Sequence, residues 1–428
     1  MLLTLYKTLM GASGPMLEAY LRRRESRGRE DPARAGERRG RPSLPRGSAP
    51  LVWFHAASVG ESLALLAIIE RVLKDYPGAE ALVTTGTVTS AKLMAERLPK
   101  RAFHQYMPVD HPDWVKSFLD HWHPDAVVWS ESELWPNILS EVKRRNIPAV
   151  LLNARMSESS FRQWKWARGM ARSVLGAFSL CLGQNEAEAK RLTALGAREV
   201  RVSSNLKYAA APLPVQQDKF NALQAATTTR KLLLFASTHP GEEQVALATH
   251  AALKDKIAGL LTIIVPRHPQ RGQEVLALAQ KATPAVAQRS TGALPDASHE
   301  IYIADTLGEM GLFFRLCKTV VMGGSFAPIG GHNPIEPAQA GCVIIYGPHM
   351  HNFVTINEDF LKAGAALQVE TEEQLHEKCA AALQSPAGVV AMAEAALKLT
   401  QEKAHVVDEI ADLLKPVLDG ALAGRKAA

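Results

Sequence analysis

The sequence predicts an α/β fold made of two doubly wound halves, each built on a parallel sheet that helices cover on both faces. Short apolar runs alternate with longer amphipathic stretches from Leu51 onward, which is typical of strands joined by helices. This alternation lapses over residues 209–230 and restarts at Leu232. We therefore expect residues 51–208 and 231–387 to form two Rossmann-like domains that are joined by a linker.

Each half is expected to contain several short, buried strands. The expected strands of the first half are Leu51–His55, Ala81–Thr84, Ala126–Trp129, Ala149–Leu152 and Leu180–Leu182. Those of the second half are Leu232–Ala236, Leu261–Val265, Val320–Met322 and Val343–Tyr346. Helix-like stretches such as Ser62–Leu73 and Pro136–Arg145 lie between strands, and residues 388–428 are expected to be helical. Polar ligands should bind at the carboxyl ends of the strands, in a cleft between the halves.

The N-terminal region predicts a membrane-binding segment. Residues 1–21 place apolar side chains mostly at three- and four-residue spacings, but polar residues, Gly and Pro interrupt them. We favour an anchor helix that lies in the membrane interface, with a spanning helix and a buried helix as alternatives. The following basic segment, 22–50, includes ten Arg and four acidic residues between 22 and 46, which accounts for the whole formal net charge of +6. The rest of the chain is neutral, so we expect an anionic membrane surface as partner and no nucleic acid.

Neither the cysteines nor the histidines predict a metal site or a disulfide. The cysteines, Cys181, Cys317, Cys342 and Cys379, lie in or near apolar runs without a CxxC pair, as reduced core residues of a cytosolic protein do. Four histidines between 104 and 123 lack the spacing of zinc ligands. We therefore expect no metal and no cofactor.

The segment HAASVGES contains the first candidate for chemistry, Glu61. An apolar strand runs into small residues, including Ser58 and Gly60, and Glu61 then lies in the first turn of a helix. A carboxylate in this place faces the edge of the sheet where ligands bind. The alternative is a helix-start residue that the macrodipole favours.

The segment VVWSESELWPNIL supplies two carboxylates at the end of a strand, Glu131 and Glu133. Capping of the following helix, with Ser132 as the cap, explains one of them but not both. Their two-residue spacing predicts that they point in different directions. Farther along, SNLKY brings Lys207 to the end of the first half, where it is either a site residue or solvent-facing.

In the second half, polar residues again follow strands. FASTHPGEE places Ser237, Thr238 and His239 at a helix start, which favours either an anion site or a capping box with Glu242. IIVPRHPQR places cations directly after a strand, where they suit a phosphate or carboxylate. These cations are Arg267, His268 and Arg271.

The most specific segment is VVMGGSFAPIGGHNPIEPAQAG. Two glycine pairs, with Gly324 and Ser325, let the backbone approach a ligand closely, and Asn333 precedes a helix whose N-terminus can accept a phosphate. The carboxylate of Glu336 in its first turn can bind the hydroxyls of a ribose. Upstream, DTLGEMG could line the same pocket. The segment is not a GxGxxG fingerprint and has no P-loop lysine, so it predicts a nucleotide sugar rather than NAD or ATP.

Taken together and in order, these segments resemble those of 3-deoxy-D-manno-octulosonic acid (Kdo) transferases. The resemblance runs from RAGERRG through HAASVGES, SESELWPN, NARMSESS, NLKY, STHPGEE, VPRHPQR, DTLGEMG and GGHNPIEP, and so covers nearly the whole chain. One departure is Ser204, where the family usually has Gly before Asn-Leu-Lys. The resemblance implies a GT-B fold, two Rossmann-like domains facing a cleft, without an essential metal.

The resemblance also implies an activity: inverting transfer of Kdo from CMP-Kdo to the lipid A precursor at the cytoplasmic face of the bacterial inner membrane. It marks Glu61 as the proton acceptor and Glu131 and Lys207 as stabilisers of the transition state. It implies CMP contacts from Arg267, His268, Gly308, Glu309, Met310, Asn333, Pro334, Ile335 and Glu336. Ser58, Gly60, Ser237, Thr238, His239, Gly324 and Ser325 are possible further donor or acceptor contacts. Two rival functions remain: an enzyme of the same architecture that uses a UDP-sugar, including a sugar epimerase, and a membrane-tethered nucleotide sensor or scaffold.

Overall fold

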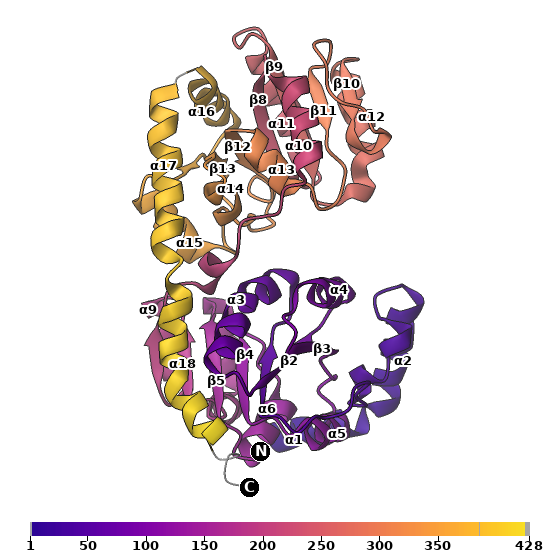
Figure 1. Cartoon of the computed structure of the whole chain (residues 1–428), viewed down its shortest axis with the longest axis vertical. Coiled ribbons are helices and arrows are strands. Elements are labelled where there is room, and N and C mark those ends of the chain that lie inside the picture. The colour runs from indigo at the N-terminus through magenta and orange to yellow at the C-terminus, as the bar shows by residue number, and fades with distance from the viewer. Residues whose placement is uncertain (1, 385, 424–428) are drawn as a thin grey trace. The chain divides into compact units, whose positions relative to one another are not determined.

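A computed structural model of the chain describes residues 2–384 and 386–423. The chain divides into two compact units, Met1–Ala210 with Ala404–Ala428 and Ala211–Lys403. Each unit has one seven-stranded sheet, and all of the paired strands are parallel. The prediction of two α/β halves with parallel sheets is confirmed (Figure 1).

The first unit has the strand order β3-β2-β1-β4-β5-β6-β7. Its strands are β1 (Leu51–His55), β2 (Glu80–Thr85), β3 (Ala102–Tyr106), β4 (Ala126–Ser130), β5 (Ala149–Ala154), β6 (Leu180–Gly183) and β7 (Val200–Val202). Two of them, β3 and β7, were not predicted. His104 and Gln105 interrupt the apolar pattern of β3, and β7 is an edge strand of only three residues.

Helices cover both faces of the first sheet. The helices of this unit are α1 (Leu2–Ala12), α2 (Gly14–Ser26), α3 (Val59–Asp75), α4 (Val88–Arg97), α5 (Pro112–Trp122), α6 (Pro136–Arg144), α7 (Glu158–Trp166), α8 (Arg168–Leu175), α9 (Glu186–Leu195) and α18 (Val406–Ala423), with 3₁₀ turns η1 (Pro32–Arg34), η2 (Glu37–Arg39) and η3 (Leu206–Ala209). The chain moves from β1 outward to β3 through α3 and α4, and then returns past β1 to β4 through α5. Right-handed crossovers in opposite directions place these helices on opposite faces.

Residues 2–26 form two helices, α1 and α2, rather than the one anchor helix expected over 1–21, of which residue 1 lies outside the described residues. Tyr6 of α1 donates a hydrogen bond to Asp110 at 3.0 Å, which ties this helix to the first unit. Several large apolar side chains of these helices are exposed: Leu2, Leu5, Leu9, Met16 and Tyr20. Within 2–384 and 386–423, no helix combines the length and apolar character needed to cross a membrane.

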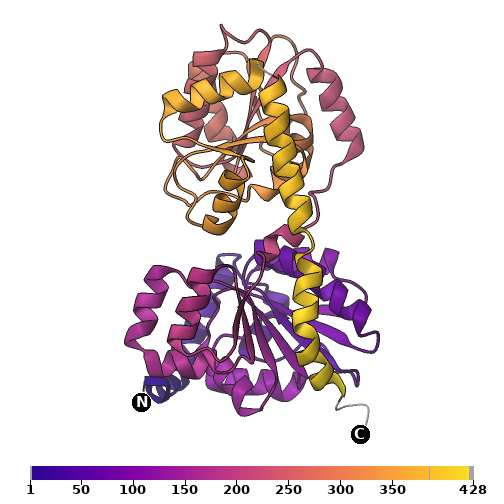
Figure 2. The same ribbon diagram turned by 90° about the vertical axis from the view of Figure 1, so that its left-hand side faces the viewer.

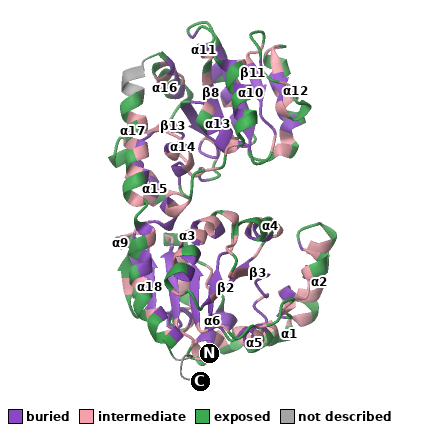
Figure 3. Cartoon of the chain, in the orientation of Figure 1, coloured by how far each residue is buried: buried purple, intermediate pink, exposed green. Residues whose placement is uncertain are grey.

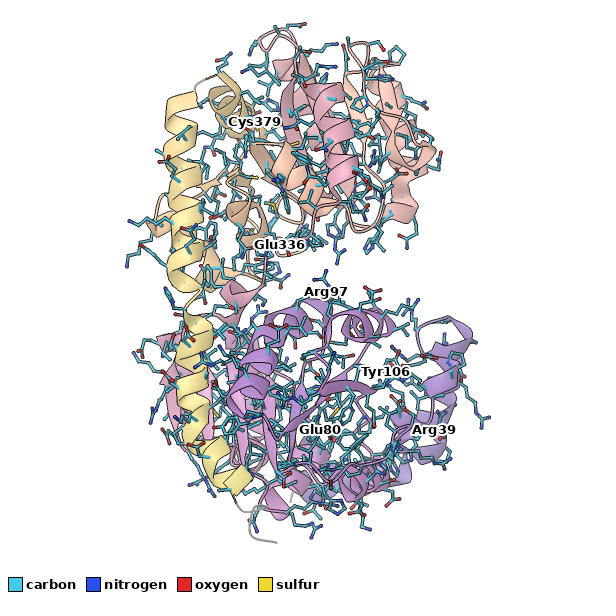
Figure 4. The ribbon with its side chains drawn as sticks, in the orientation of Figure 1. Arg39, Glu80, Arg97, Tyr106, Glu336 and Cys379 are labelled. Atoms are coloured by element: carbon cyan, nitrogen blue, oxygen red, sulfur yellow. The ribbon has the colours of Figure 1, made fainter. Side chains whose placement is uncertain are left out.

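Many arginines of the basic segment 22–50 are bound within the protein. Arg39, labelled in Figure 4, pairs with Glu18 at 2.8 Å. Arg34 binds Glu37 at 2.8 Å and the His104 carbonyl at 2.7 Å. Further side chains of the segment bind carboxylates or carbonyls in the same unit: Arg24, Arg38 and Arg46. The charges of these side chains thus fasten the segment to the first unit, and contact of the segment with an anionic membrane surface stays a prediction.

The second unit has the strand order β10-β11-β9-β8-β12-β13-β14. Its strands are β8 (Lys231–Thr238), β9 (Leu260–Pro266), β10 (Val286–Gln288), β11 (Ile301–Ile303), β12 (Thr319–Met322), β13 (Val343–Tyr346) and β14 (Leu367–Gln368). The edge strands β10 and β14 and the strand next to β10, β11, have two or three residues each and were not predicted, because so short a run carries no periodicity.

The helices of the second unit begin inside the expected linker. They are α10 (Gln217–Thr227), α11 (Glu242–Leu253), α12 (Gly272–Ala282), α13 (Met310–Leu316), α14 (Ile335–Gln339), α15 (Val354–Lys362), α16 (Glu372–Gln384) and α17 (Pro386–Lys403), with 3₁₀ turns η4 (Pro269–Arg271) and η5 (Arg289–Thr291). The C-terminal helical stretch is split between the units. Its first helix, α17, packs on α14 and β13, whereas α18 packs on α3, β4 and β5 of the first unit, as Figure 2 shows for its yellow ribbon.

The core of each unit lies between its sheet and its helices, and the strands are almost entirely buried (Figure 3). In the first unit Trp53 of β1 contacts Trp129 of β4 edge to face, with 5.3 Å between the ring centroids. All four cysteines are free and buried, Cys379 on α16 among them (Figure 4). The prediction of reduced core cysteines is confirmed.

Candidate active site

In the first unit, the strand order reverses between β1 and β4, and we call the region at the carboxyl ends of these two strands the first crevice. These strands are neighbours in the sheet although β2 and β3 separate them in the chain. A parallel sheet binds polar ligands at such a reversal of strand order, because the connecting loops diverge there. Glu61 follows β1 and Glu131 follows β4, so the fold brings two of the predicted residues to the same crevice.

Glu61 completes a hydrogen-bonded N-terminus of α3. Ser58 is the N-cap; its hydroxyl accepts from the Glu61 N–H at 3.4 Å and donates to Glu61 Oε1 at 2.8 Å. The Ala57 N–H donates to Glu61 Oε2 at 2.9 Å. The helix-start interpretation of Glu61 is thus correct as geometry. A structural role does not exclude a chemical one for Glu61. Burial, and after it the charge of Glu131, raises the pKa of the Glu61 carboxyl.

Glu131 is held in a strained backbone conformation. Its φ is +58°, in the left-handed region of backbone conformations that residues other than Gly and Asn rarely adopt. Its side chain is buried and Oε1 accepts from Lys207 Nζ at 2.9 Å and from Asn153 Nδ2 at 3.3 Å. Glu133 turns to a different partner, the indole of Trp135 at 2.8 Å, as the two-residue spacing predicted.

Capping of α6 by Ser132 was a wrong alternative. The N-terminal N–H groups of this helix at Asn137 and Ile138 donate to the carboxylate of Asp110 instead, both at 2.9 Å. Burial raises the pKa of Asp110 to about 6. Because Asp110 takes over the capping role, Glu131 is available for another one.

Lys207 reaches the crevice from the 3₁₀ turn η3, which packs against α3. The Asn205 side chain accepts from the Lys207 N–H at 3.0 Å, and Asn153 Oδ1 accepts from the Leu206 N–H at 3.1 Å. These two amides fix the turn that carries the ammonium group. The first unit therefore brings Glu61, Glu131 and Lys207 together. It leaves Ser58 and Gly60 exposed beside them.

In the second unit, the corresponding reversal of strand order lies between β8 and β12, which are again neighbours in the sheet but distant in the chain, and we call the region at their carboxyl ends the second crevice. Ser237 at the end of β8 has a φ of +61°. A Cβ on Gly323, after β12, would lie only 2.4 Å from the Ser237 carbonyl oxygen, so this position requires glycine. Gly324 has a φ of +68°, and the buried Ser325 side chain donates to the Met322 carbonyl at 2.6 Å.

Glu242 fastens the loops of this crevice to α11. Its buried carboxylate accepts from four backbone N–H groups, those of His239, Gly324, Phe326 and Ala327, at 2.7–3.2 Å. Thr238 is also buried, and its hydroxyl donates to Glu243 at 2.9 Å. The Glu242 carboxylate thus binds N–H groups of the loops that follow β8 and β12, and the anion site expected at the start of α11 stays a prediction. The Thr238 hydroxyl is engaged by Glu243, and the predicted donor contact of Thr238 stays a prediction.

Three histidines gather at the second crevice. His239 Nε2 lies 3.0 Å from His332 Nε2, and their rings are nearly parallel, whereas His268 stands edge-on to His239. Burial, and then the nearby cationic groups including Arg267, lowers the pKa of His332 to about 4. At neutral pH His332 is uncharged and available for hydrogen bonding. The sequence did not single it out, although it directly precedes the predicted Asn333.

The three cations predicted after β9 have different environments. Arg271 binds Glu243 at 2.6 Å and Glu274 at 2.8 Å, so its charge is neutralised within the unit. Arg267 instead acts on the crevice, where its charge opposes protonation of both His332 and Glu336. Arg267 and His268 are thus the members of this group that can meet an anion.

Glu336 lies in the first turn of α14, at the lower edge of the second unit in Figure 4. Asn333 Nδ2 donates to Glu336 Oε1 at 3.4 Å, and Asn333 Oδ1 accepts from the Ile335 N–H at 3.2 Å. Burial raises the pKa of Glu336. The helix has only five residues, so its dipole is a weaker phosphate site than the sequence suggested.

A cavity of about 340 Å³ opens beside Glu336 within the second unit. It is lined by Pro212, Leu213, Val215, Gly311, Phe314, Arg315, Lys318, Glu336, Gln339 and Ala340. The walls are largely apolar, and the polar groups are one carboxylate (Glu336), one amide (Gln339) and two cations (Arg315 and Lys318). A cavity with such walls is suited to a nucleoside. The segment that contributes Gly311 follows the predicted contacts Gly308, Glu309 and Met310.

The side chain of Glu309 is occupied by structural contacts. Burial alone would raise its pKa, but hydrogen bonds from Arg289, Lys219 and Thr306 outweigh burial and lower the pKa to about 2. Arg289 lies 3.0 Å and Lys219 2.7 Å from its carboxylate. Only the backbone of this turn, where Gly308 has a φ of +80°, is then suited to a ligand. Within the described part of the chain, no group of His, Cys, Asp and Glu side chains is arranged to hold a metal ion.

Comparison with known proteins places this geometry in a family. Residues 33–210 match the family model described as 3-deoxy-D-manno-octulosonic-acid transferase (kdotransferase). The 3-deoxy-D-manno-octulosonic acid transferase of Rickettsia felis is 36% identical over 86% of this chain and 79% of its own length. The enzyme of the same name from Haemophilus influenzae is 31% identical over 86% of this chain and 87% of its own length.

A solved structure with the same architecture is the UDP-GlcNAc 2-epimerase of Neisseria meningitidis bound to UDP-GlcNAc. It superimposes with a TM-score of 0.59 over 85% of this chain and 100% of its own, but is only 13% identical. At that identity the likeness concerns the fold alone. The identity to the transferases over most of both chains shows instead that this chain belongs to the 3-deoxy-D-manno-octulosonic acid (Kdo) transferase family.

Proposed function

We propose that this chain, a Kdo-transferring glycosyltransferase, moves Kdo from CMP-Kdo to a hydroxyl of the lipid A precursor. In this proposal the first unit supplies the catalytic groups and binds the acceptor, and the second unit binds the donor, as the GT-B resemblance implies. The observation that carries it is the coupling of Glu61 to the Glu131–Lys207 ion pair at one sheet edge.

Glu61 has the properties of a general base. A carboxylate takes a proton from a hydroxyl more effectively when its pKa is raised towards the working pH, and burial and Glu131 both raise that of Glu61. The acceptor oxygen then attacks the anomeric carbon of Kdo as the bond to the CMP phosphate breaks. The hydroxyl proton goes to Glu61 and the bonding electrons leave with CMP. A single displacement of this kind inverts the configuration.

The Glu131–Lys207 pair provides oriented charge for the transition state. The transition state has oxocarbenium character, and the donor brings both a carboxylate and a phosphate. Glu131 fixes the direction of the Lys207 ammonium at 2.9 Å. Negative charge develops on the departing CMP. A cation that is held in place before the reaction stabilises this charge without a reorganisation cost. Because Glu131 is engaged with Lys207, it is suited to this supporting role rather than to nucleophilic attack.

The second unit has the groups that a cytidine nucleotide requires. Arg267 and His268 provide a positive charge and hydrogen bonds for the phosphate, and His239 and His332 lie beside them. The carboxylate of Glu336 borders the cavity of about 340 Å³, where it suits the ribose hydroxyls. Chemistry with these groups needs no metal, in agreement with the family resemblance.

We also propose that the protein binds peripherally to the cytoplasmic face of the inner membrane. The exposed apolar side chains of α1 and α2 would enter the interface, and arginines outside the internal ion pairs would meet anionic headgroups. Five arginines are available for this: Arg22, Arg23, Arg27, Arg29 and Arg41.

Two rivals make different predictions for one experiment. Purified protein is incubated with a tetra-acylated lipid A precursor and either CMP-Kdo or a UDP-sugar, and the lipid product and the nucleotide are both analysed. Our proposal predicts release of CMP with a Kdo-bearing lipid. Turnover of the UDP-sugar alone would support the epimerase-like rival, and nucleotide binding without any turnover would support the sensor or scaffold.

A further inference from the structure

Asn153 occupies a central place in the first crevice without a role in the proposal so far. It lies near the end of β5, the strand next to β4, within the segment NARMSESS. Its side chain is 2% exposed. The side-chain amide donates one hydrogen bond and accepts another. Nδ2 donates to Glu131 Oε1 at 3.3 Å, and Oδ1 accepts from the Leu206 N–H at 3.1 Å. One amide therefore contacts Glu131 and the turn that carries Lys207.

Asn153 shares the left-handed backbone conformation of Glu131. Asn153 has a φ of +50° and Glu131 a φ of +58°, at the ends of two adjacent strands. The Glu131 N–H donates to the carbonyl of Leu152, directly before Asn153, at 2.9 Å. Asn adopts this conformation readily, whereas for a residue such as Glu131 it is unfavourable and persists where the surroundings impose it, often at functional sites.

Further amides connect Asn153 to the other side of the ion pair. Gln184 Nε2 donates to the Asn153 carbonyl at 2.9 Å, and Asn205 Nδ2 donates to Gln184 Oε1 at 3.0 Å. Asn205 in turn accepts from the Lys207 N–H at 3.0 Å. This closed chain of amides runs from the carboxylate of Glu131 to the backbone of Lys207. Neutral amides can orient both members of an ion pair without changing its net charge.

We propose that Asn153 is a positioning residue for Kdo transfer, which holds the Glu131 carboxylate and the Lys207 turn in register with each other. This inference rests on the roles proposed above for Glu131 and Lys207. Its donor bond fixes the rotation of the Glu131 carboxylate, and its acceptor bond fixes the start of η3. Loss of the donor bond lets the Lys207 ammonium move, which lowers kcat rather than the affinity for the donor substrate.

The substitution Asn153→Asp separates the two bonds. Aspartate has nearly the same shape, tolerates the left-handed backbone and keeps an oxygen for the Leu206 N–H. It replaces the donor to Glu131 by a carboxylate oxygen. At neutral pH we expect kcat to fall by about 10-fold or more, with the KM for CMP-Kdo changed by less than about 2-fold, as for the loss of a group that acts mainly on the transition state.

The pH dependence of this variant gives the sharper result. Two carboxylates in contact share a proton at a pH where isolated ones do not, and the introduced aspartate, once protonated, regains the ability to donate to Glu131. We therefore expect the ratio of variant to native kcat to rise as the pH falls. The charged groups around this position are Glu61, Glu131, Glu188, Arg155 and Lys207. They are present in both proteins. Because the introduced carboxylate also raises the pKa of Glu61, the ratio is taken at pH values above the acidic limbs of both profiles, where Glu61 is deprotonated in both proteins.

Asn146 provides the matched control. It is also an asparagine with a positive φ, +55°, but it is exposed at the end of α6 and its N–H donates to the Lys143 carbonyl. Asn146→Asp should leave kcat and its pH profile unchanged. A positioning role for Asn153 is contradicted if Asn153→Asp retains native kcat, or if it loses activity by a factor that does not change with pH.

A second variant keeps the inference testable if Asn153→Asp does not fold. Asn153→Gly adopts the left-handed backbone without strain and lacks both side-chain bonds. It should lower kcat while the KM for CMP-Kdo stays near the native value, and native kcat would overturn the inference. Failure of the proposed function is distinguishable, because the native protein would then transfer no Kdo at all.

Discussion

Lys207 Nζ lies 2.9 Å from Glu131 Oε1, and both side chains are largely buried at the end of β4. An ion pair that is removed from solvent is costly to break, because the remaining partner is left as an uncompensated charge. The pair also lies beside Glu61, whose pKa the charge of Glu131 raises. One carboxylate thus influences the proposed base and directs the proposed cation.

Replacement of the proposed base should affect turnover rather than donor binding. Glu61→Gln keeps the size of the side chain and an oxygen for the Ala57 N–H. A glutamine side chain, however, cannot take the proton from the hydroxyl of the lipid substrate. We expect kcat to fall by about 10²–10⁴-fold, the usual contribution of general base catalysis. The affinity for CMP, measured by calorimetry, should stay unchanged. A variant with native kcat would exclude Glu61 as the base.

The pH profile should reveal the coupling between the two carboxylates. Glu61 works as a base only when it is deprotonated, so kcat should rise with pH through its raised pKa. Glu131→Gln removes a negative charge that raises this pKa. The acidic limb of the profile should therefore move to lower pH in Glu131→Gln, although the maximal rate is lower. A limb that stays in place, or moves to higher pH, would contradict the coupling.

A double-mutant cycle tests whether Glu131 and Lys207 act as one unit. Either Glu131→Gln or Lys207→Met should lower kcat strongly, since each single change leaves a charge without its partner. The double variant should lose much less than the product of the two single losses. If the loss in the double variant equals the product of the two single losses, the two residues act separately. Circular dichroism of each variant checks that the fold is retained.

Binding of nucleotides to the second unit tests the role of Glu336. If its carboxylate binds the ribose, the native protein should bind CMP about 10-fold more tightly than deoxy-CMP, which lacks the 2′-hydroxyl; this corresponds to the loss of one hydrogen bond to a charged group. Glu336→Ala should reduce this discrimination towards one. Calorimetry with both nucleotides measures it. Unchanged discrimination in the variant would place the ribose elsewhere.

Substitution of Glu242 should strongly lower the stability of the fold. Four backbone N–H groups donate to this buried carboxylate, and Glu242→Ala leaves them without their acceptor. We expect a loss of about 3 kcal/mol or more in the free energy of unfolding, measured with a denaturant. Glu274→Ala on α12 is the matched control, because that carboxylate is mostly exposed and should change stability little. Similar losses in both variants would contradict this role of Glu242.

The sequence predicts the parallel α/β halves because buried parallel strands are continuous apolar runs, and all nine predicted strands are present. It misses β3 and the short edge strands, where polar residues or short length remove the pattern. Glu61, Glu131 and Lys207 follow strands whose order in the sheet brings them together. Contacts between distant segments are harder to predict. The cap that Asp110 provides for α6 and the bonds of Asn153 depend on side chains about 20 or more residues apart.

The difference between a site residue and a structural residue also depends on such contacts. Arg267 and Arg271 are four residues apart and look alike in the sequence, but Glu243 and Glu274 neutralise only Arg271. Likewise, Glu309 is bound to Arg289 and Lys219, although its motif suggested a donor contact. A motif predicts where a loop lies, whereas the partners of each side chain come from the folded structure.

The most direct test of the proposed function is the mass of the lipid product. Native protein and Glu61→Gln are incubated with CMP-Kdo and a tetra-acylated lipid A precursor, and the lipids are analysed by mass spectrometry. The native protein should add at least one Kdo unit to the lipid, and the variant should add none in the same time. Absence of any Kdo-bearing product with the native protein, or equal product with Glu61→Gln, would contradict the account.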